Sequence, residues 1–183
     1  MDTLRAAVTG PDIRRAKGQR RLVMITAYDA PSAALADAAG VDMLLVGDSL
    51  GMAVLGRRDT LSVTMEEMLH PCRAVSAAGT RALVVGDMPF MSYEPDPRTA
   101  LINAGRLMAE GGARAVKLEG GVTAAAQIRA LTAAGIPVMG HVGLTPQRVA
   151  ALGGFKVQAK SAKSAALVLE DALAVQEAGC FAV

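Results

Sequence analysis

Three acidic residues, Asp48, Asp87 and Glu119, each end an apolar segment of the sequence. The first two occupy the same place in a repeated unit, which consists of Ala-Ala-Gly, an apolar segment and a terminal Val-Gly-Asp. A hard divalent cation such as Mg²⁺ prefers oxygen ligands and keeps open positions for water or substrate. The spacing therefore predicts a metal site formed by Asp48, Asp87 and Glu119.

A lysine and a histidine accompany these acids at the predicted strand ends. The period of two in a strand turns Lys117 and Glu119 to one face, and Val116 and Leu118 to the other. We expect the apolar pair to face helices and Lys117 to point inward, either onto a ligand or into a structural ion pair. His141 also ends a segment; it is either a ligand for an oxyanion or carbonyl, or a solvated loop residue.

The elements that must position these residues follow a regular order of helix, glycine and apolar strand. Glycine just past a helix fits the left-handed position that ends it, and continuous apolar segments indicate parallel strands covered on both faces. The pattern predicts strands near residues 22–27, 43–48, 82–87, 114–119, 137–141 and 180–183, and helices near 30–39, 65–78, 97–110, 123–134 and 163–178, with a shorter helix after Thr145.

This order predicts an α/β fold, a (βα)₈ TIM barrel in which strand ends meet at one face. A closed barrel needs at least about 200 residues, whereas the chain has 183 and stops within an apolar segment. We expect residues 1–183 to form a single, incomplete TIM-barrel domain with about the first five βα units and the start of strand six.

Helix starts carry recognisable signals. Asp29, Asp96 and Thr145 each precede a proline by one or two residues, and we expect their side chains to cap helices. Thr64 and Glu67 have the spacing of a capping box.

Composition restricts the class of protein. The chain is 52% hydrophobic and 3% aromatic, and no apolar segment reaches the roughly 20 residues of a membrane span. The N-terminal region has basic residues but no apolar signal segment, so we expect a cytoplasmic protein. A net charge of +2 without interleaved aromatics gives no reason to expect a nucleic-acid partner. The N-terminal basic residues are expected to form a solvated face; they are Arg14, Arg15, Lys17, Arg20 and Arg21.

Five motifs, in order, resemble the ketopantoate hydroxymethyltransferase family; they are residues 24–29, 46–52, 86–93, 116–121 and 140–147. The resemblance covers the chain from about Arg21 onward. It implies a Mg²⁺-dependent (βα)₈ barrel that transfers a hydroxymethyl group from 5,10-methylenetetrahydrofolate to 3-methyl-2-oxobutanoate in pantothenate biosynthesis. The product would be ketopantoate, formed through a Mg²⁺-stabilised enolate. It also implies a homo-oligomer, commonly a decamer.

The resemblance also implies roles for single residues. Asp48 and Asp87 would bind Mg²⁺ directly and Glu119 through water, while Ser49, Asp87, Lys117 and His141 would bind the oxo acid. The catalytic glutamate of the family would come just beyond Val183, so no catalytic base is assigned within the chain. One departure is Ala159, where the family usually has glycine.

Two alternatives remain at this point. One is a related Mg²⁺-dependent barrel acting on oxo acids, of the phosphoenolpyruvate mutase or isocitrate lyase type. The other is a non-catalytic truncated barrel that serves in binding or assembly.

Overall fold

The structure is a computed structural model that describes residues 6–183. Its strands are β1 Met24–Thr26, β2 Met43–Val46, β3 Leu83–Asp87, β4 Ala115–Glu119 and β5 Val138–His141. Its α-helices are α1 Gly10–Arg15, α2 Ala30–Ala38, α3 Leu50–Ala53, α4 Met65–Ala77, α5 Pro97–Ala109, α6 Ala125–Ala133, α7 Val149–Leu152 and α8 Ala162–Glu177. Two 3₁₀ helices are η1 Val122–Ala124 and η2 Pro146–Arg148.

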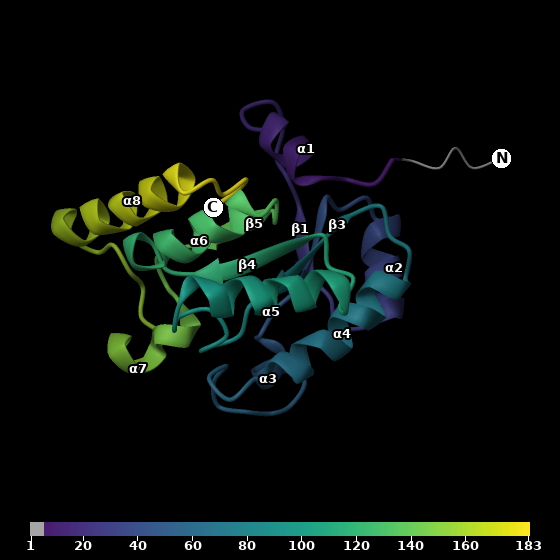
Figure 1. The fold of residues 1–183 in the computed structure, drawn as a ribbon, viewed down its shortest axis with the longest axis horizontal. Helices are drawn as coiled ribbons and strands as arrows, with labels where there is room; N and C mark the ends of the chain where they lie inside the picture. Colours follow the sequence, from purple (N-terminus) through teal and green to yellow (C-terminus); the bar gives the residue numbers. More distant parts are fainter. Residues whose placement is uncertain (1–5) are drawn as a thin grey trace.

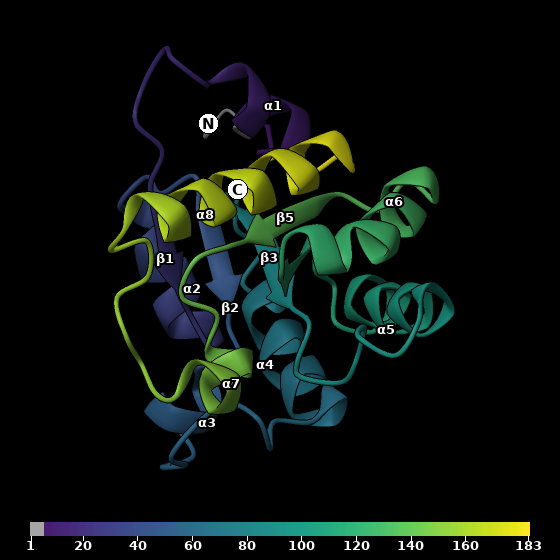
Figure 2. The ribbon, with the colours of Figure 1, turned by 90° about the vertical axis from the view of Figure 1, so that its left-hand side faces the viewer.

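The five strands form one parallel sheet in the order β1-β2-β3-β4-β5, as predicted for a (βα)₈ barrel. Figures 1 and 2 show the helices α2, α4, α5 and α6 along one face of this sheet. The start of a sixth strand is present as a parallel bridge between Met139 and Ala182. The fold is therefore a partial (βα)₈ barrel, and the predicted fold class is confirmed.

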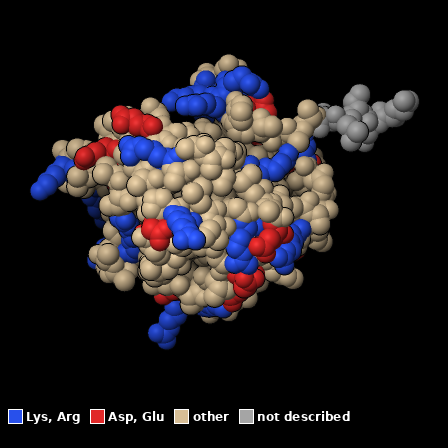
Figure 3. All heavy atoms as spheres, in the orientation of Figure 1, with Lys and Arg blue, Asp and Glu red and all other residues tan. Residues whose placement is uncertain are grey.

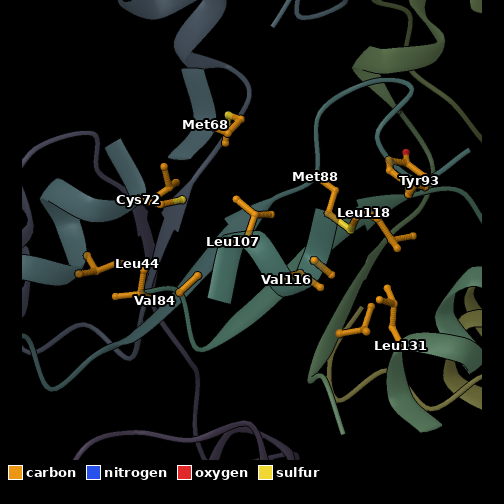
Figure 4. Close-up of a cluster of buried hydrophobic side chains, with 14 of the residues drawn as sticks. Leu44, Met68, Cys72, Val84, Met88, Tyr93, Leu107, Val116, Leu118 and Leu131 are labelled. Atoms are coloured by element: carbon orange, nitrogen blue, oxygen red, sulfur yellow. The ribbon is translucent and has the colours of Figure 1, made fainter. Parts of the chain in front are cut away.

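The main hydrophobic core lies between the sheet and these helices. Outward-facing strand residues such as Leu44, Val84, Val116 and Leu118 pack there with helix residues such as Leu107. Figure 4 shows this cluster, with Met88 and Tyr93 at the edge where the strands end. Because Val116 and Leu118 face the helices, the period of two turns Lys117 and Glu119 to the other face, as predicted.

A second cluster covers the inner face of the sheet at its N-terminal end. Inward-facing strand residues such as Met43, Leu83 and Met139 pack there against Val8 and Ile13. Ile13 belongs to α1, an element that the sequence patterns did not predict, because six residues are too few to show a helical period. The helix closes this end of the sheet, above the strands in Figure 1.

The basic residues of the N-terminal segment are exposed, and one of them also pairs with a buried acid. Arg20 Nη1 donates to Asp42 Oδ2 at 3.0 Å, and Asp42 is only 4% exposed. The same oxygen accepts from Val23 N at 2.9 Å, so this ion pair fixes the entry into β1. The five basic residues are exposed, as expected, and Arg20 also supplies the paired charge that the buried carboxylate of Asp42 needs.

Helix starts follow the sequence signals with one exception. Asp29 accepts from Ser32 N, Asp96 accepts from Thr99 N, and Thr64 forms its capping box. Thr145 makes no side-chain cap; it is buried before η2, and the predicted helix there divides into η2 and α7. The predicted helix 123–134 likewise begins as η1, and α3 was not predicted.

Ala159 adopts a left-handed backbone conformation with φ of 59°. This region favours glycine, because a Cβ approaches the following carbonyl oxygen. An alanine at this position therefore leaves the loop with local backbone strain.

Positive and negative side chains alternate over the face shown in Figure 3. Among the ion pairs of the surface, Arg106 Nη2 lies 2.6 Å from Glu66 Oε1, and Arg106 Nε lies 2.9 Å from Glu110 Oε1. Among residues 6–183, no helix is both long enough and apolar enough to cross a membrane.

Candidate active site

Four of the predicted residues gather on the inner face of the sheet, at the carboxyl ends of three successive strands. Asp87 ends β3, Lys117 and Glu119 lie in β4, and His141 ends β5. The strand register sets Asp87 beside Lys117, and Glu119 beside His141. Asp48 follows β2 by two residues and is also buried. The parallel register thus brings together residues that are far apart in the sequence.

Lys117 and Asp87 form a buried ion pair. Lys117 Nζ lies 2.6 Å from Asp87 Oδ1 and 2.7 Å from Asp87 Oδ2, and the two side chains are 11% and 2% exposed. Burial acts to lower the pKa of Lys117, but the negative charges of Asp87, Asp48 and Glu119 outweigh it and raise the pKa above its usual value. Lys117 is therefore charged at neutral pH.

Asp48 lies beside this pair without a cation of its own. Its backbone N donates to Asp87 Oδ2 at 3.3 Å, and its Oδ2 accepts from Gln147 Nε2 at 2.8 Å. Burial first, and then the negative charge of Asp87, raise the pKa of Asp48. Burial thus makes the ionised form of Asp48 less favourable than it would be in water.

Glu119 contacts the loop that follows β5. Its Oε2 accepts from Gln147 N at 3.0 Å, and its Oε1 lies 3.3 Å from His141 Nδ1. The latter contact lacks hydrogen-bond geometry, and the buried Nδ1 has no other partner among the described residues. This nitrogen is therefore a buried polar atom whose hydrogen-bonding capacity the described residues leave unused.

A side chain of α8 holds the loop that follows β4. Asp171 Oδ1 accepts from Val122 N at 2.9 Å, and a Cβ on Gly121 would overlap the Asp171 side chain. Only glycine leaves room for Asp171 here, so α8 can approach the backbone of this loop closely.

Ser49 stands apart from the carboxylates. It lies in the turn between β2 and α3, and its Oγ is 2.8 Å from Tyr28 Oη. It follows Asp48 directly, so its hydroxyl lies at the same end of the sheet without a hydrogen bond to the acids of the site.

Sequence reasoning missed Gln147 and Tyr93 as members of the site. Both are buried, and Tyr93 Oη lies 2.7 Å from Gln147 Oε1. Burial, and then the charge of Glu94, raise the pKa of Tyr93, so its phenol stays protonated. Each residue ends one of the quoted motifs, 86–93 and 140–147, which was the available signal.

The charges of the site suit a hard divalent cation. The buried carboxylates of Asp48, Asp87 and Glu119 face the single ammonium group of Lys117, so two negative charges remain uncompensated when all are ionised. All three acids offer oxygen donors. Within residues 6–183, however, no three His, Cys, Asp or Glu side chains meet as a metal-binding cluster. Lys117 binds both oxygens of Asp87, and Glu119 turns toward Gln147 and His141.

Comparisons with known proteins agree on family and fold. A sequence profile described as ketopantoate hydroxymethyltransferase matches residues 7–183. A 3-methyl-2-oxobutanoate hydroxymethyltransferase of Oleidesulfovibrio alaskensis is 64% identical over 97% of the chain and 61% of its own length. The chain spans 57–62% of the length of the curated relatives that it matches.

Solved structures with low sequence identity share the fold. A phosphonopyruvate hydrolase in complex with oxalate and Mg²⁺ matches with a TM-score of 0.68 and 18% identity, over 94% of this chain and 61% of its own. A 2,3-dimethylmalate lyase, described as a member of the PEP mutase/isocitrate lyase superfamily, matches with a TM-score of 0.63 and 20% identity, over 96% and 62%.

Proposed function

The chain belongs to the ketopantoate hydroxymethyltransferase family, and from this premise we propose that it supplies the metal-binding and oxo-acid-binding residues of a 3-methyl-2-oxobutanoate hydroxymethyltransferase. In the proposed reaction, the methylene carbon of 5,10-methylenetetrahydrofolate and a water molecule supply a hydroxymethyl group to 3-methyl-2-oxobutanoate, which gives 2-dehydropantoate and releases tetrahydrofolate. The observation that carries the proposal is the buried group of three carboxylates and one lysine at the ends of neighbouring strands.

Asp48 and Asp87 would hold Mg²⁺ directly, and Glu119 would hold it through water. When bound, the cation would supply Lewis-acid polarisation of the substrate carbonyl, which is worth several kcal/mol. The excess negative charge around Asp48 supports this assignment, because burial and Asp87 already raise the pKa of Asp48. Lys117 binds both oxygens of Asp87, so a cation held by Asp87 would replace at least one of these contacts.

The remaining side chains would bind the oxo acid. Lys117 is cationic at neutral pH and lies on the inner face, so it reduces the repulsion between the acids and an anionic substrate. His141 ends β5 and its side chain is 31% exposed, so its imidazole would donate to a substrate oxygen. Ser49 carries a hydroxyl at the same end of the sheet, held by Tyr28.

The proton on the carbon next to the oxo group must be removed by a base. The family resemblance assigns this step to a glutamate that would follow Val183, and Lys117, His141 and the buried acids have other roles in the proposal. We therefore expect the 183 residues to bind the substrate without turnover. We also propose a cytoplasmic homo-oligomer, a decamer by the same resemblance.

A chimera tests the proposal directly. In it, the C-terminal part of the Oleidesulfovibrio alaskensis relative, 64% identical over the shared region, would follow Val183. The chimera should form 2-dehydropantoate from 3-methyl-2-oxobutanoate and 5,10-methylenetetrahydrofolate with Mg²⁺, whereas the 183 residues alone should not. Asp87→Asn should abolish this activity, and Asp96→Asn should retain it, because Asp96 is an exposed helix cap.

The same assay separates the alternatives. A folded chimera that cleaves phosphonopyruvate and leaves 3-methyl-2-oxobutanoate unchanged would favour a relative of the phosphoenolpyruvate mutase type. A folded chimera without either activity would favour a non-catalytic barrel. The identities of 54–64% to curated hydroxymethyltransferases favour the formation of 2-dehydropantoate over both of these results.

A further inference from the structure

Gln147 connects acids from two strands that are not neighbours. It lies in η2, after β5, and is 3% exposed. Its Nε2 donates to Asp48 Oδ2 at 2.8 Å and to Met88 O at 2.9 Å, and its backbone N donates to Glu119 Oε2 at 3.0 Å. One residue thus contacts both Asp48, after β2, and Glu119, in β4.

The orientation of the Gln147 amide is fixed by its partners. Its NH₂ group faces two acceptors, a carboxylate and a carbonyl, so the oxygen must point the other way. There it meets the phenol of Tyr93 at 2.7 Å. In a flipped amide, the Gln147 oxygen would face the acceptor oxygens of Asp48 and Met88, and both hydrogen bonds would be lost.

Tyr93 extends this connection to the backbone of β4. Its hydroxyl has one proton to donate, and the 2.7 Å contact with Gln147 Oε1 is shorter than the 3.1 Å contact with Glu119 O. The hydroxyl in turn accepts from Glu119 N at 3.2 Å. A continuous series of hydrogen bonds therefore runs from Glu119 through Tyr93 and Gln147 to Asp48.

We propose that Gln147, oriented by Tyr93, is a positioning residue that fixes the carboxylates of Asp48 and Glu119 for a divalent cation. The role rests on the metal site of the proposed function. A neutral side-chain amide suits the contact with Asp48, because it holds that carboxylate without neutralising its charge, while the backbone N–H of Gln147 holds Glu119. A lysine in the same place would also donate to Asp48 but would repel the cation.

Binding of Mn²⁺, followed by electron paramagnetic resonance, tests this role in the full chain. Gln147→Met keeps a similar volume and removes the side-chain donors, so the Kd for Mn²⁺ should rise by about 10–100-fold. Tyr93→Phe keeps the amide donors of Gln147 but removes the hydroxyl that orients the amide, so the Kd for Mn²⁺ should rise by less than in Gln147→Met. Gln127→Met is the matched control: Gln127 is also buried, on α6, and makes only a 3.4 Å contact with Glu94 O.

A structural role alone would act differently. It would lower the unfolding midpoint in EDTA for both Gln→Met variants and leave the Kd for Mn²⁺ unchanged. A wild-type chain that binds Mn²⁺ and a Gln147→Met variant that binds it equally well would overturn the positioning role while leaving the metal site intact.

Crystal structures of the metal-free wild type and Gln147→Met separate this inference from the proposed function. If the wild type binds no Mn²⁺, the metal site of the proposed function fails. The positioning role is then tested by the conformation of the carboxylates alone. If Gln147 holds Asp48, the Asp48 side chain should adopt a different rotamer in Gln147→Met. An unchanged Asp48 rotamer would overturn the role in either case.

Discussion

Replacing Lys117 with methionine should destabilise the metal-free chain strongly at pH 7 and weakly at pH 5. The substitution removes two short hydrogen bonds to Asp87, whose side chain is 2% exposed, and leaves that carboxylate next to buried Asp48. Removing one partner of a buried ion pair typically costs about 3–5 kcal/mol. At pH 7 the cost cannot exceed about 4 kcal/mol. Protonating one carboxyl group with an ordinary pKa of about 3.9 removes the unpaired charge, and at pH 7 this protonation costs about that much.

The same bound falls by about 1.4 kcal/mol for each unit of pH, which gives roughly 1.5 kcal/mol at pH 5. The assay is urea unfolding followed by circular dichroism in EDTA at both pH values. Lys163→Met on the exposed surface of α8 is the matched control and should change the free energy of unfolding by less than about 0.5 kcal/mol. A loss below about 1 kcal/mol at pH 7, or an equal loss at both pH values, would refute the reasoning.

Two further predictions concern the scaffold. Ala159→Gly should raise the free energy of unfolding by about 0.5–1 kcal/mol, because relief of the φ of 59° exceeds the added chain entropy; thermal unfolding measures it, and a lower midpoint would contradict it. The Arg57 guanidinium, with the Thr64 backbone, lowers the pKa of Glu67 from 4.5 to about 2, so its stabilisation is present above pH 4.5 and is lost as the pH falls toward 2. Glu67→Gln should flatten that part of the stability curve in acid titrations; an unchanged slope would exclude the contribution.

Local patterns in the sequence predicted much of the fold and most of the proposed site. The alternation of Lys117 and Glu119 with apolar residues gave the inward face of β4, and Asp29 and Asp96 cap their helices where their spacing indicated. These features succeed because strand period and capping depend on residues only a few positions apart. The repeated strand-end acids were visible for the same reason.

The tertiary structure decided which of these residues meet. Gln147 lies 99 residues from Asp48 in the sequence, and only the strand order and register bring the amide of one to the carboxylate of the other. The pairing of Lys117 with both oxygens of Asp87 likewise follows from neighbouring strands. The sequence by itself determined which chemical groups stand at the strand ends, because strand period is local. Packing determined their partners, because the hydrogen bonds of a buried polar group depend on every element that surrounds it.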